Sequence, residues 1–306
     1  MNKKLTGVTA MIPSFNCKKN LFRTLDFLLK SNYPNLEIIV IDNGSTDGTW
    51  QEGKKKYKKV KWIDAGAINI GQTGCYNLGF AHANPKNHVM MVDSDVVVDK
   101  AMIANLVSRL ESKPKIGVVT PMVLYLNDEN WVNQAGSTVN LWTGKVTIGW
   151  GDRKKFLEAK EVQGSGTVMI FKRKLIETIG GFEDWFLCYF DPEYSVRGKK
   201  AGFSTWYEPE AICYHDQDKD EDYWRPRVMS RAFLLGKNRT LFMRKHGKNI
   251  LVYILFTPLL FAYYLREALR YNLMNKWYEL IQGTIAGFFY PLNNNVKLPL
   301  PVIDQR

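Results

Sequence analysis

The chain has 306 residues, of which 45% are hydrophobic and 13% aromatic. This composition supplies a large buried core and excludes a disordered chain, and the length allows one large domain or two smaller ones. The net charge of +12 predicts an anionic partner: nucleotide phosphates, a nucleic acid or an acidic membrane surface. Four widely spaced cysteines, without a Cys-x-x-Cys pair, disfavour a zinc site or a disulfide framework and fit a reducing cytosol.

The first fifteen residues, MNKKLTGVTAMIPSF, are not expected to act as a signal peptide. Their apolar run is too short for that role, and Pro13 interrupts it.

Short apolar runs then alternate with segments of helical spacing. Strands are expected at 8–15, 36–42, 60–65, 88–93 and 116–124, and helices at 17–31, 46–59, 75–83 and 100–112. This alternation predicts an α/β fold with a largely parallel sheet and helices on both faces. In such sheets ligands bind at the carboxyl ends of the strands. Residues 125–162 are expected to form a hairpin-rich insertion.

Polar residues follow three of the predicted strands at the point where each strand ends. Ser14 and Asn16 follow the first, the turn DNGSTDGT (42–49) follows the second, and Asp93 and Asp95 follow the fourth. Residues i and i+2 of a strand point to the same side, so the two carboxylates are expected to project together. Because two adjacent carboxylates repel each other, a positive partner is expected beside them.

Helix capping is the alternative reading of these carboxylates, since either Asp95 or Asp99 can cap a helix that begins near Lys100. The glycines of NIGQTGCYNLG (69–79) do not form a dinucleotide-binding fingerprint, and no Gly-Lys-Ser/Thr phosphate loop occurs in the sequence. A conventional NAD or ATP site is therefore disfavoured.

Taken in order, these segments resemble the family 2 glycosyltransferases, which have the GT-A fold, a Rossmann-like sheet flanked by helices. The resemblance covers about residues 5 to 222. It implies that 1–222 is a catalytic domain that transfers a sugar from a nucleotide-diphosphate sugar to an acceptor hydroxyl with inversion. It rests on IPSFN (12–16), YPNLEIIVIDNGSTDGT (33–49), NIGQTGCYNLG (69–79), DSD (93–95), GSGTVMIFKRKLIETIGGFED (164–184) and YFDPEYSVRGKKAGF (189–203).

The resemblance implies a role for each matching position. Asp93 and Asp95 would be the Asp-x-Asp motif that holds Mn²⁺ or Mg²⁺, with Asp95 as the direct ligand. His215 would lie near the metal or the diphosphate, although a lone histidine is often structural. The cation would act as a Lewis acid on the departing diphosphate. The nucleotide sugar would be bound by Pro13, Ser14, Asn16, Asp42, Asn43, Gly71, Asn77, Asp93 and Ser94.

The same resemblance makes Asp191 the general base that deprotonates the acceptor hydroxyl. Phe190 replaces the first acid of the family pattern, and Glu193 replaces a later one. The alternative for Asp191 is an N-cap with Pro192 at the first helical position, and Glu193 can form an i,i+4 pair with Arg197. The acceptor and sugar side would include Gly166, Trp185 and Glu193, with ordinary packing as the alternative for Trp185.

Residues 223–306 are expected to form a basic and apolar helical region associated with a membrane. From Asp222 to Lys276, eleven basic residues stand against two acids, and ILVYILFTPLLFAYYL (250–265) carries no charge. Sixteen residues fall short of the roughly 20 that span a bilayer, and Pro258 interrupts them. These features favour an interfacial or re-entrant helix over a span, with a buried core helix as the alternative.

The resemblance to membrane-associated relatives implies a glycan or lipid-linked acceptor and peripheral association with the cytoplasmic face of the cell membrane. The Gln-x-x-Arg-Trp motif of the processive synthases is absent, which favours transfer of a single sugar. A nucleotidyltransferase and a non-enzymatic protein that binds membranes are the alternatives. Nucleic-acid binding is disfavoured, because the basic residues flank apolar runs and do not form an aromatic groove.

Overall fold

The computed structural model describes residues 6–183, 185 and 187–292. Residues 1–5 of the predicted catalytic domain and residues 293–306 of the predicted helical region lie outside the described residues, as does Asp184 of the GSGTVMIFKRKLIETIGGFED segment.

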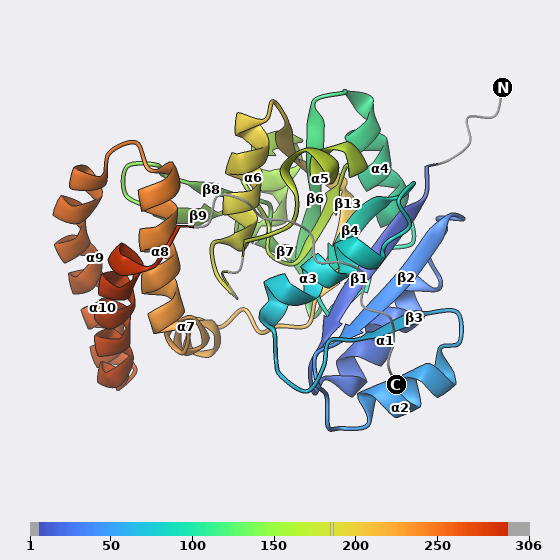
Figure 1. The fold of residues 1–306 in the computed structure, drawn as a ribbon, viewed down its shortest axis with the longest axis horizontal. Coiled ribbons are helices and arrows are strands. Elements are labelled where there is room, and N and C mark those ends of the chain that lie inside the picture. Colours follow the sequence, from blue (N-terminus) through green and yellow to red (C-terminus); the bar gives the residue numbers. More distant parts are fainter. Residues whose placement is uncertain (1–5, 184, 186, 293–306) are drawn as a thin grey trace.

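The first part of the chain forms the parallel half of the central sheet (Figure 1). Its strands run in the order β4-β1-β2-β3, and each neighbouring pair is parallel. All seven elements match predicted ones, except that α3 begins four residues before the predicted start at 75. They are β1 (Val8–Ser14), α1 (Lys18–Leu28), β2 (Leu36–Asp42), α2 (Thr49–Lys56), β3 (Lys61–Asp64), α3 (Gly71–His82) and β4 (His88–Val92).

The rest of the sheet is mixed. Strand β12 lies between β4 and β6 and is antiparallel to both, whereas β13 is parallel to β6 and antiparallel to β5. The α/β class is therefore confirmed. The predicted parallel arrangement holds for β1 to β4 and for the β6–β13 pair, whereas β12, β5 and the hairpin strand β7 pair antiparallel with their neighbours. The helices and strands of this part of the chain, in which β8 and β9 form a separate two-stranded sheet, are β5 (Val96–Val98), α4 (Met102–Ser112), β6 (Ile116–Tyr125), β7 (Asp128–Gln134), β8 (Ser137–Val139), β9 (Val146–Ile148), β10 (Gly151–Asp152), the 3₁₀ helix η1 (Arg153–Phe156), β11 (Lys160–Val162), β12 (Val168–Phe171), α5 (Arg173–Ile179), α6 (Phe190–Lys200) and β13 (Ser204–His215).

Alternate residues of the central strands pack into two separate hydrophobic cores, one on each face of the sheet. Val40 of β2 packs in the cluster under α1 and α4, whereas its neighbours Ile39 and Ile41 pack in the cluster under α3, α5 and α6. Both sets are fully buried. This explains why the sequence shows continuous apolar runs, which strands covered on both faces require. Helices on both faces also leave the carboxyl ends of the strands as the open edge.

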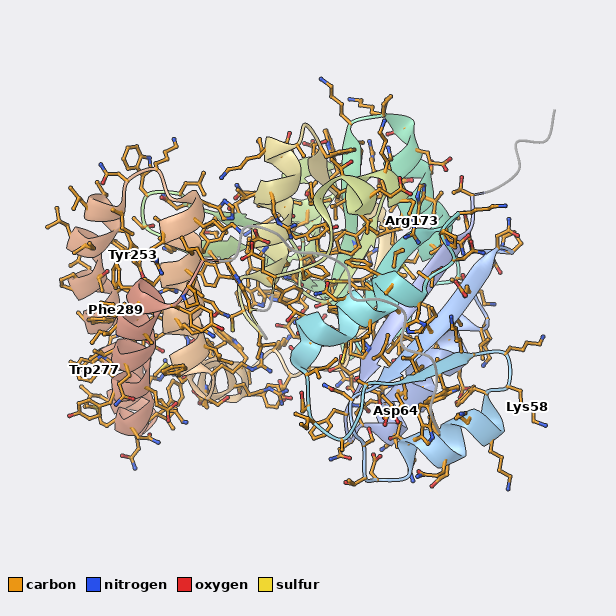
Figure 2. All side chains as sticks on the ribbon, in the orientation of Figure 1. Lys58, Asp64, Arg173, Tyr253, Trp277 and Phe289 are labelled. Carbon is orange, nitrogen blue, oxygen red and sulfur yellow. The ribbon has the colours of Figure 1, made fainter. Side chains whose placement is uncertain are left out.

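Four helices form the C-terminal part, at the opposite end of the molecule from β2 and β3 (Figure 1). Helices α8 and α10 pack closely because glycines lie at their contact: a Cβ on Gly283 would stand 2.0 Å from the Phe233 carbonyl oxygen. Tyr253 of α9 is buried in this group, and Phe289 of α10 is exposed (Figure 2). The helices are α7 (Glu221–Met229), α8 (Ala232–His246), α9 (Ile250–Arg270) and α10 (Met274–Phe289).

Helix α9 corrects the expectation that Pro258 interrupts the apolar run. The helix continues through Pro258 and extends over 21 residues, so it includes the charged residues that follow the run. A proline inside a helix removes one backbone hydrogen bond, and the remaining bonds and side-chain contacts sustain the helix. Among the described helices, α9 is long and apolar enough to cross a membrane, and only 17% of its apolar window is buried.

Replacement of Gly283 tests the α8–α10 contact. Gly283→Leu is expected to lower the free energy of unfolding by about 3 kcal/mol, because the added side chain overlaps backbone atoms of α8. Gln282→Leu, which adds the same side chain at the exposed neighbouring position, is the matched control. Denaturant unfolding measures both variants, and equal losses of stability would contradict the close packing of the two helices.

Candidate active site

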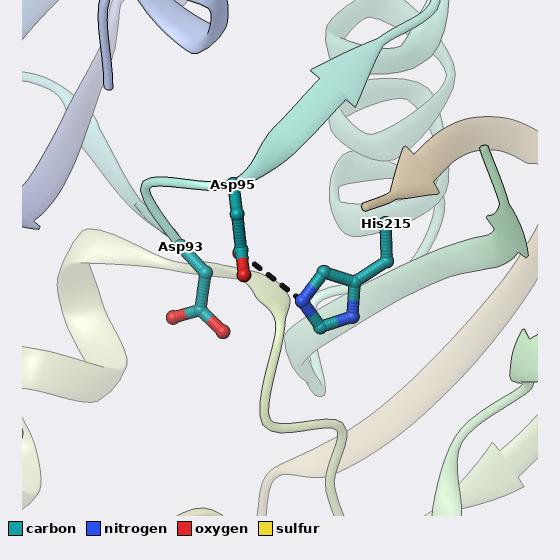
Figure 3. Close-up of side chains that lie close together, drawn as sticks. All are labelled: Asp93, Asp95 and His215. Atoms are coloured by element: carbon teal, nitrogen blue, oxygen red, sulfur yellow. Dashed lines mark hydrogen bonds and ion pairs between the residues drawn. The ribbon is translucent and has the colours of Figure 1, made fainter. Parts of the chain in front are cut away.

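Two carboxylates and an imidazole meet at the carboxyl end of β4 (Figure 3). Asp93, Ser94 and Asp95 connect β4 with β5, and β5 pairs with β13 so that Val96 lies opposite His215. This register brings His215 Nε2 to 3.1 Å from Asp95 Oδ1. Ligand atoms of Asp93, Asp95 and His215 all lie within 4.8 Å of one another.

Helix α3 supplies hydrogen bonds to Asp93. Gln72 Nε2 and the Tyr76 hydroxyl each donate to Asp93 Oδ1 at 2.9 Å. Burial, together with the nearby charge of Asp95, raises the pKa of Asp93 to about 7. A bound divalent cation would relieve this repulsion, so the electrostatics of the pair fit a metal.

His215 stabilises the ionised carboxylate of Asp95. Burial alone would raise the pKa of Asp95, but the hydrogen bond and charge of His215 outweigh it, so the pKa is lowered overall. For His215 itself, burial acts to lower the pKa, and the bond to Asp95 with the surrounding carboxylates raises it above its usual value. Carboxylate oxygens suit hard divalent ions, and an imidazole ligand also suits a transition metal.

The cluster lies on the wall of a cavity of about 540 Å³, a size typical of small-molecule sites. Most of the predicted binding residues line it: Pro13, Ser14, Asn43, Gly71, Asp93, Ser94, Asp95 and His215. The other lining residues are Phe15, Cys17, Asn69, Gln72, Leu187, Gln217, Arg227 and Arg231. Residues from strand ends, α3 and the C-terminal region therefore share one cavity.

Asp42 adjoins this cavity without lining it. It pairs in register with Ser14, and Asn43 follows it in the chain. Its Oδ2 accepts from the Ser45 amide at 3.2 Å, whereas its buried Oδ1 has no hydrogen-bond partner among the described residues. Burial raises the pKa of Asp42. An unsatisfied buried oxygen at this place can accept a hydrogen bond from a ligand hydroxyl or base.

Two predicted binding residues instead hold neighbouring segments together. Asn16 is exposed, and its side-chain oxygen accepts from the Thr46 amide at 2.8 Å. Asn77 bonds Phe182 at both ends of its amide: Nδ2 donates to the Phe182 carbonyl at 2.8 Å, and Oδ1 accepts from the Phe182 amide at 2.7 Å. Neither residue is part of the cavity lining.

Asp191 lies in the first turn of α6, and the alternative role as its N-cap is excluded. The helix begins at Phe190, and the cap position belongs to Tyr189, so Pro192 is the third helical residue. Burial raises the pKa of Asp191 to about 7. Gly164 lies against the carboxylate, since a Cβ there would stand 2.6 Å from Asp191 Oδ2. Asp191 is not among the residues that line the 540 Å³ cavity.

Phe190, which replaces an acid of the family pattern, is 5% exposed and belongs to the core. Its ring centroid lies 6.2 Å from that of Tyr76 and 5.5 Å from that of Phe182. Because the Tyr76 hydroxyl also donates to Asp93, one aromatic contact joins the carboxylate cluster to the helix that carries Asp191.

The predicted acceptor-side residues have different surroundings. Trp185 is 4% exposed and packs edge-to-face against Phe242 of α8, which favours the packing alternative over stacking on a sugar. Glu193 is 1% exposed, and the predicted pair with Arg197 forms, with Nε at 3.1 Å. Gly166 is half-buried, and the space where its Cβ would stand is open to 4 Å.

Gln72, Tyr76, Arg227 and Arg231 contribute to this site without being among the predicted site residues. Gln72 and Tyr76 stand one helical turn apart in the segment NIGQTGCYNLG. Arg227 and Arg231 belong to the predicted membrane-associated region, and they line the cavity. Arg227 lies in α7 and Arg231 occupies the N-cap position of α8, so the junction between the two helices brings both guanidinium groups to the cavity.

The chain belongs to glycosyl transferase family 2, whose family model matches residues 9–180, more than half of its length. It is similar to the poly-beta-1,6-N-acetyl-D-glucosamine synthases of Staphylococcus epidermidis (26% identity over 216 residues) and Staphylococcus aureus strain COL (26% over 212 residues). These matches cover 70% and 69% of this chain. The chain spans about half the length of these curated relatives, 50% in each case.

Solved structures share the fold, as expected for GT-A. The mannosyltransferase PcManGT from Pyrobaculum calidifontis, in complex with GDP-Man and Mn²⁺, has a TM-score of 0.59 at 19% identity, over 93% of this chain and 87% of that one. GalNAc-T7 with UDP, GalNAc and Mn²⁺ has a TM-score of 0.59 at 14% identity, over 78% and 51%. Both likenesses concern the fold.

The carboxylate cluster predicts metal binding without any substrate. Mn²⁺ at a hundredfold excess over its Kd is expected to stabilise the protein by about 2.7 kcal/mol, which raises the Tm. Asp95→Asn is expected to abolish this shift, because it removes the charged ligand beside His215. Asp99→Asn is the control, since Asp99 is exposed and its side chain accepts from the Ala101 amide, away from the cluster. An unchanged Mn²⁺ shift in Asp95→Asn would exclude this cluster as the metal site.

Proposed function

We propose that this protein is an inverting, metal-dependent glycosyltransferase that moves one sugar from a nucleotide-diphosphate donor to an acceptor hydroxyl. The observation that carries the proposal is the meeting of Asp93, Asp95 and His215 on the wall of a cavity of nucleotide-sugar size. Membership of glycosyl transferase family 2 supports the reaction class.

Different side chains around the cavity would bind the metal, the diphosphate and the nucleoside. Asp93, Asp95 and His215 would hold Mn²⁺ or Mg²⁺, which when bound supplies Lewis-acid stabilisation of the leaving diphosphate. Arg227 and Arg231 add fixed positive charge on the same cavity, and the charge of Arg227 reaches Asp95. The unsatisfied Oδ1 of Asp42, together with Pro13, Ser14, Asn43, Gly71 and Ser94, would receive the nucleoside.

Asp191 would serve as the general base. Its carboxylate takes the proton of the acceptor hydroxyl while that oxygen forms the bond to the anomeric carbon and the nucleoside diphosphate departs from the opposite side. A pKa of about 7 gives the carboxylate more basicity than an exposed aspartate has. Gly166, next to open space, would form part of the wall on the acceptor side.

The acceptor is proposed to be a glycan or a lipid-linked sugar. The relatives named as poly-beta-1,6-N-acetyl-D-glucosamine synthases support a polysaccharide product. The absence of a Gln-x-x-Arg-Trp motif favours addition of a single sugar.

A lipid-linked acceptor requires a place at the cytoplasmic face of the membrane, and α9 with α10 offers a surface for it. The exposed apolar side chains of these helices lie among basic residues, as in interfacial helices. The most exposed are Leu251, Leu255, Leu259 and Leu269 of α9 and Tyr278, Ile285 and Phe289 of α10.

Substitution of Asp191 distinguishes binding of the donor nucleotide from transfer of the sugar. Among UDP, GDP, dTDP and CMP, at least one is expected to raise the Tm with Mn²⁺ and not with EDTA. Asp191→Asn is expected to keep that Tm shift. Its rate of nucleotide release from the sugar donor is expected to fall by about 10²-fold or more, which is the usual contribution of a general base. In the wild type, the rate should rise tenfold per pH unit below about 7 and then level off, because only the ionised carboxylate accepts a proton.

Two outcomes would contradict this assignment. If no nucleotide stabilises the protein with metal, the transferase proposal loses its support. If Asp191→Asn releases nucleotide at the wild-type rate, another residue is the base.

Membrane association is tested with vesicles of phosphatidylglycerol and phosphatidylethanolamine. The wild type is expected to float with them and to release as salt rises, because anionic headgroups attract the basic residues. Leu255→Glu with Leu259→Glu is expected to abolish flotation. Leu157→Glu, equally exposed on the catalytic domain, is the matched control. Flotation of the double variant at the wild-type level would show that α9 does not touch the lipid.

A further inference from the structure

The backbone that leads into Asp191 has an unusual conformation. Cys188 and Tyr189 have φ values of 65° and 62°, so two successive non-glycine residues are left-handed. Such residues persist only where their surroundings fix them, and they cluster at functional sites. The next residues begin α6, which carries Asp191 in its first turn.

A single buried amide on α8 holds this segment. Asn238 is 0% exposed, and its Nδ2 donates to the carbonyls of Trp185 at 2.8 Å and Cys188 at 3.1 Å, and to that of Leu187. Its Oδ1 has no hydrogen-bond partner within the described part of the chain. The side chain therefore acts as a donor to the backbone that precedes Asp191.

The neighbouring residue on α8 fixes the ring of Tyr189. Arg239 is 5% exposed, and its Nε donates to the Tyr189 hydroxyl at 2.8 Å. That hydroxyl in turn donates to the Gly144 carbonyl in the β8–β9 hairpin. The guanidinium also donates to the hydroxyl of Tyr264 on α9 at 3.4 Å.

The far end of α8 contacts Glu193, which lies with Asp191 in the first turn of α6. His246 Nε2 lies 3.2 Å from Glu193 Oε1, and Lys245 Nζ lies 3.7 Å from the same oxygen. Lys245 also forms an ion pair with Glu183. Helix α8 thus contacts the chain on both sides of Asp191.

The carboxylate of Asp191 depends on this backbone support. Among the side chains that the structure describes, no hydrogen bond to Asp191 is formed, and its close neighbour is the backbone of Gly164. Its direction is therefore set by the path of the chain from Leu187 to Glu193. A base must lie within hydrogen-bond reach of the proton it removes, so small shifts of this path weaken catalysis.

We propose that Asn238 is a positioning residue for Asp191, acting through the left-handed segment 188–189. This inference rests on the proposed function of Asp191. It gives Asn238 of α8 a role in orienting Asp191, in addition to the packing of α8 against α9 and α10.

The experiment compares Asn238→Ala with Thr240→Val. Thr240 is equally buried on α8, but its hydroxyl bonds the Gly236 carbonyl and the Tyr253 hydroxyl, away from the segment. Nucleotide release from the donor gives kcat and KM, and hydrogen exchange of peptides covering 185–193 gives the local order without reference to activity.

Asn238→Ala is expected to lower kcat on the order of tenfold to a hundredfold, with donor KM within about twofold, and to speed exchange in 185–193. Thr240→Val is expected to leave kcat and this exchange unchanged at a similar loss of Tm. Asn238→Ser keeps one donor and is expected to fall between Asn238→Ala and the wild type, and it serves if the alanine variant does not fold.

Equal kcat in Asn238→Ala and Thr240→Val at matched Tm overturns the proposal, as does a loss expressed in KM alone. If the wild type releases no nucleotide from any donor, the proposed function itself fails. In that case faster exchange in Asn238→Ala marks a structural clamp only, which separates the two failures.

Discussion

The repulsion between Asp93 and Asp95 is the constraint around which the cavity is organised. Both carboxylates stand at the end of a strand buried on both faces, where like charges are costly. Gln72 and Tyr76 satisfy the first, and His215 satisfies the second. The partners come from α3 and β13, and they leave one side of the pair facing the cavity. A divalent cation bound there would complete the charge balance.

The C-terminal region contributes residues to this site and also exposes apolar side chains on its outer surface. Arg227 and Arg231 bring positive charge to the cavity, and Asn238 bonds the backbone that precedes Asp191. Helices α9 and α10 cover the far side of α8 and expose apolar side chains. One bundle therefore joins the surface suited to a membrane with the segment that carries the proposed base, so the predicted boundary at 222 separates chain segments that share a cavity.

Sequence reasoning succeeded where the pattern is local. The apolar strands and the polar residues that end them follow from strand periodicity and turn chemistry, which also place Asp93 and Asp95 together at a strand end. Where packing decides, the sequence left alternatives open or was misleading. Burial of Trp185 against α8 favours the packing alternative, Tyr189 rather than Asp191 occupies the N-cap position of α6, and the predicted interruption at Pro258 is wrong because α9 continues through it.

The sequence by itself determined the α/β class and the carboxylates at the strand end, because each depends on neighbours within a few residues, and it determined the family through the order of short motifs along the chain. The tertiary structure decided which distant groups meet them. His215 reaches Asp95 through the pairing of β5 with β13, across 120 residues of chain. Arg227, Arg231 and Asn238 reach the site through the packing of α7 and α8. Such meetings depend on long-range register and burial, which no local pattern records.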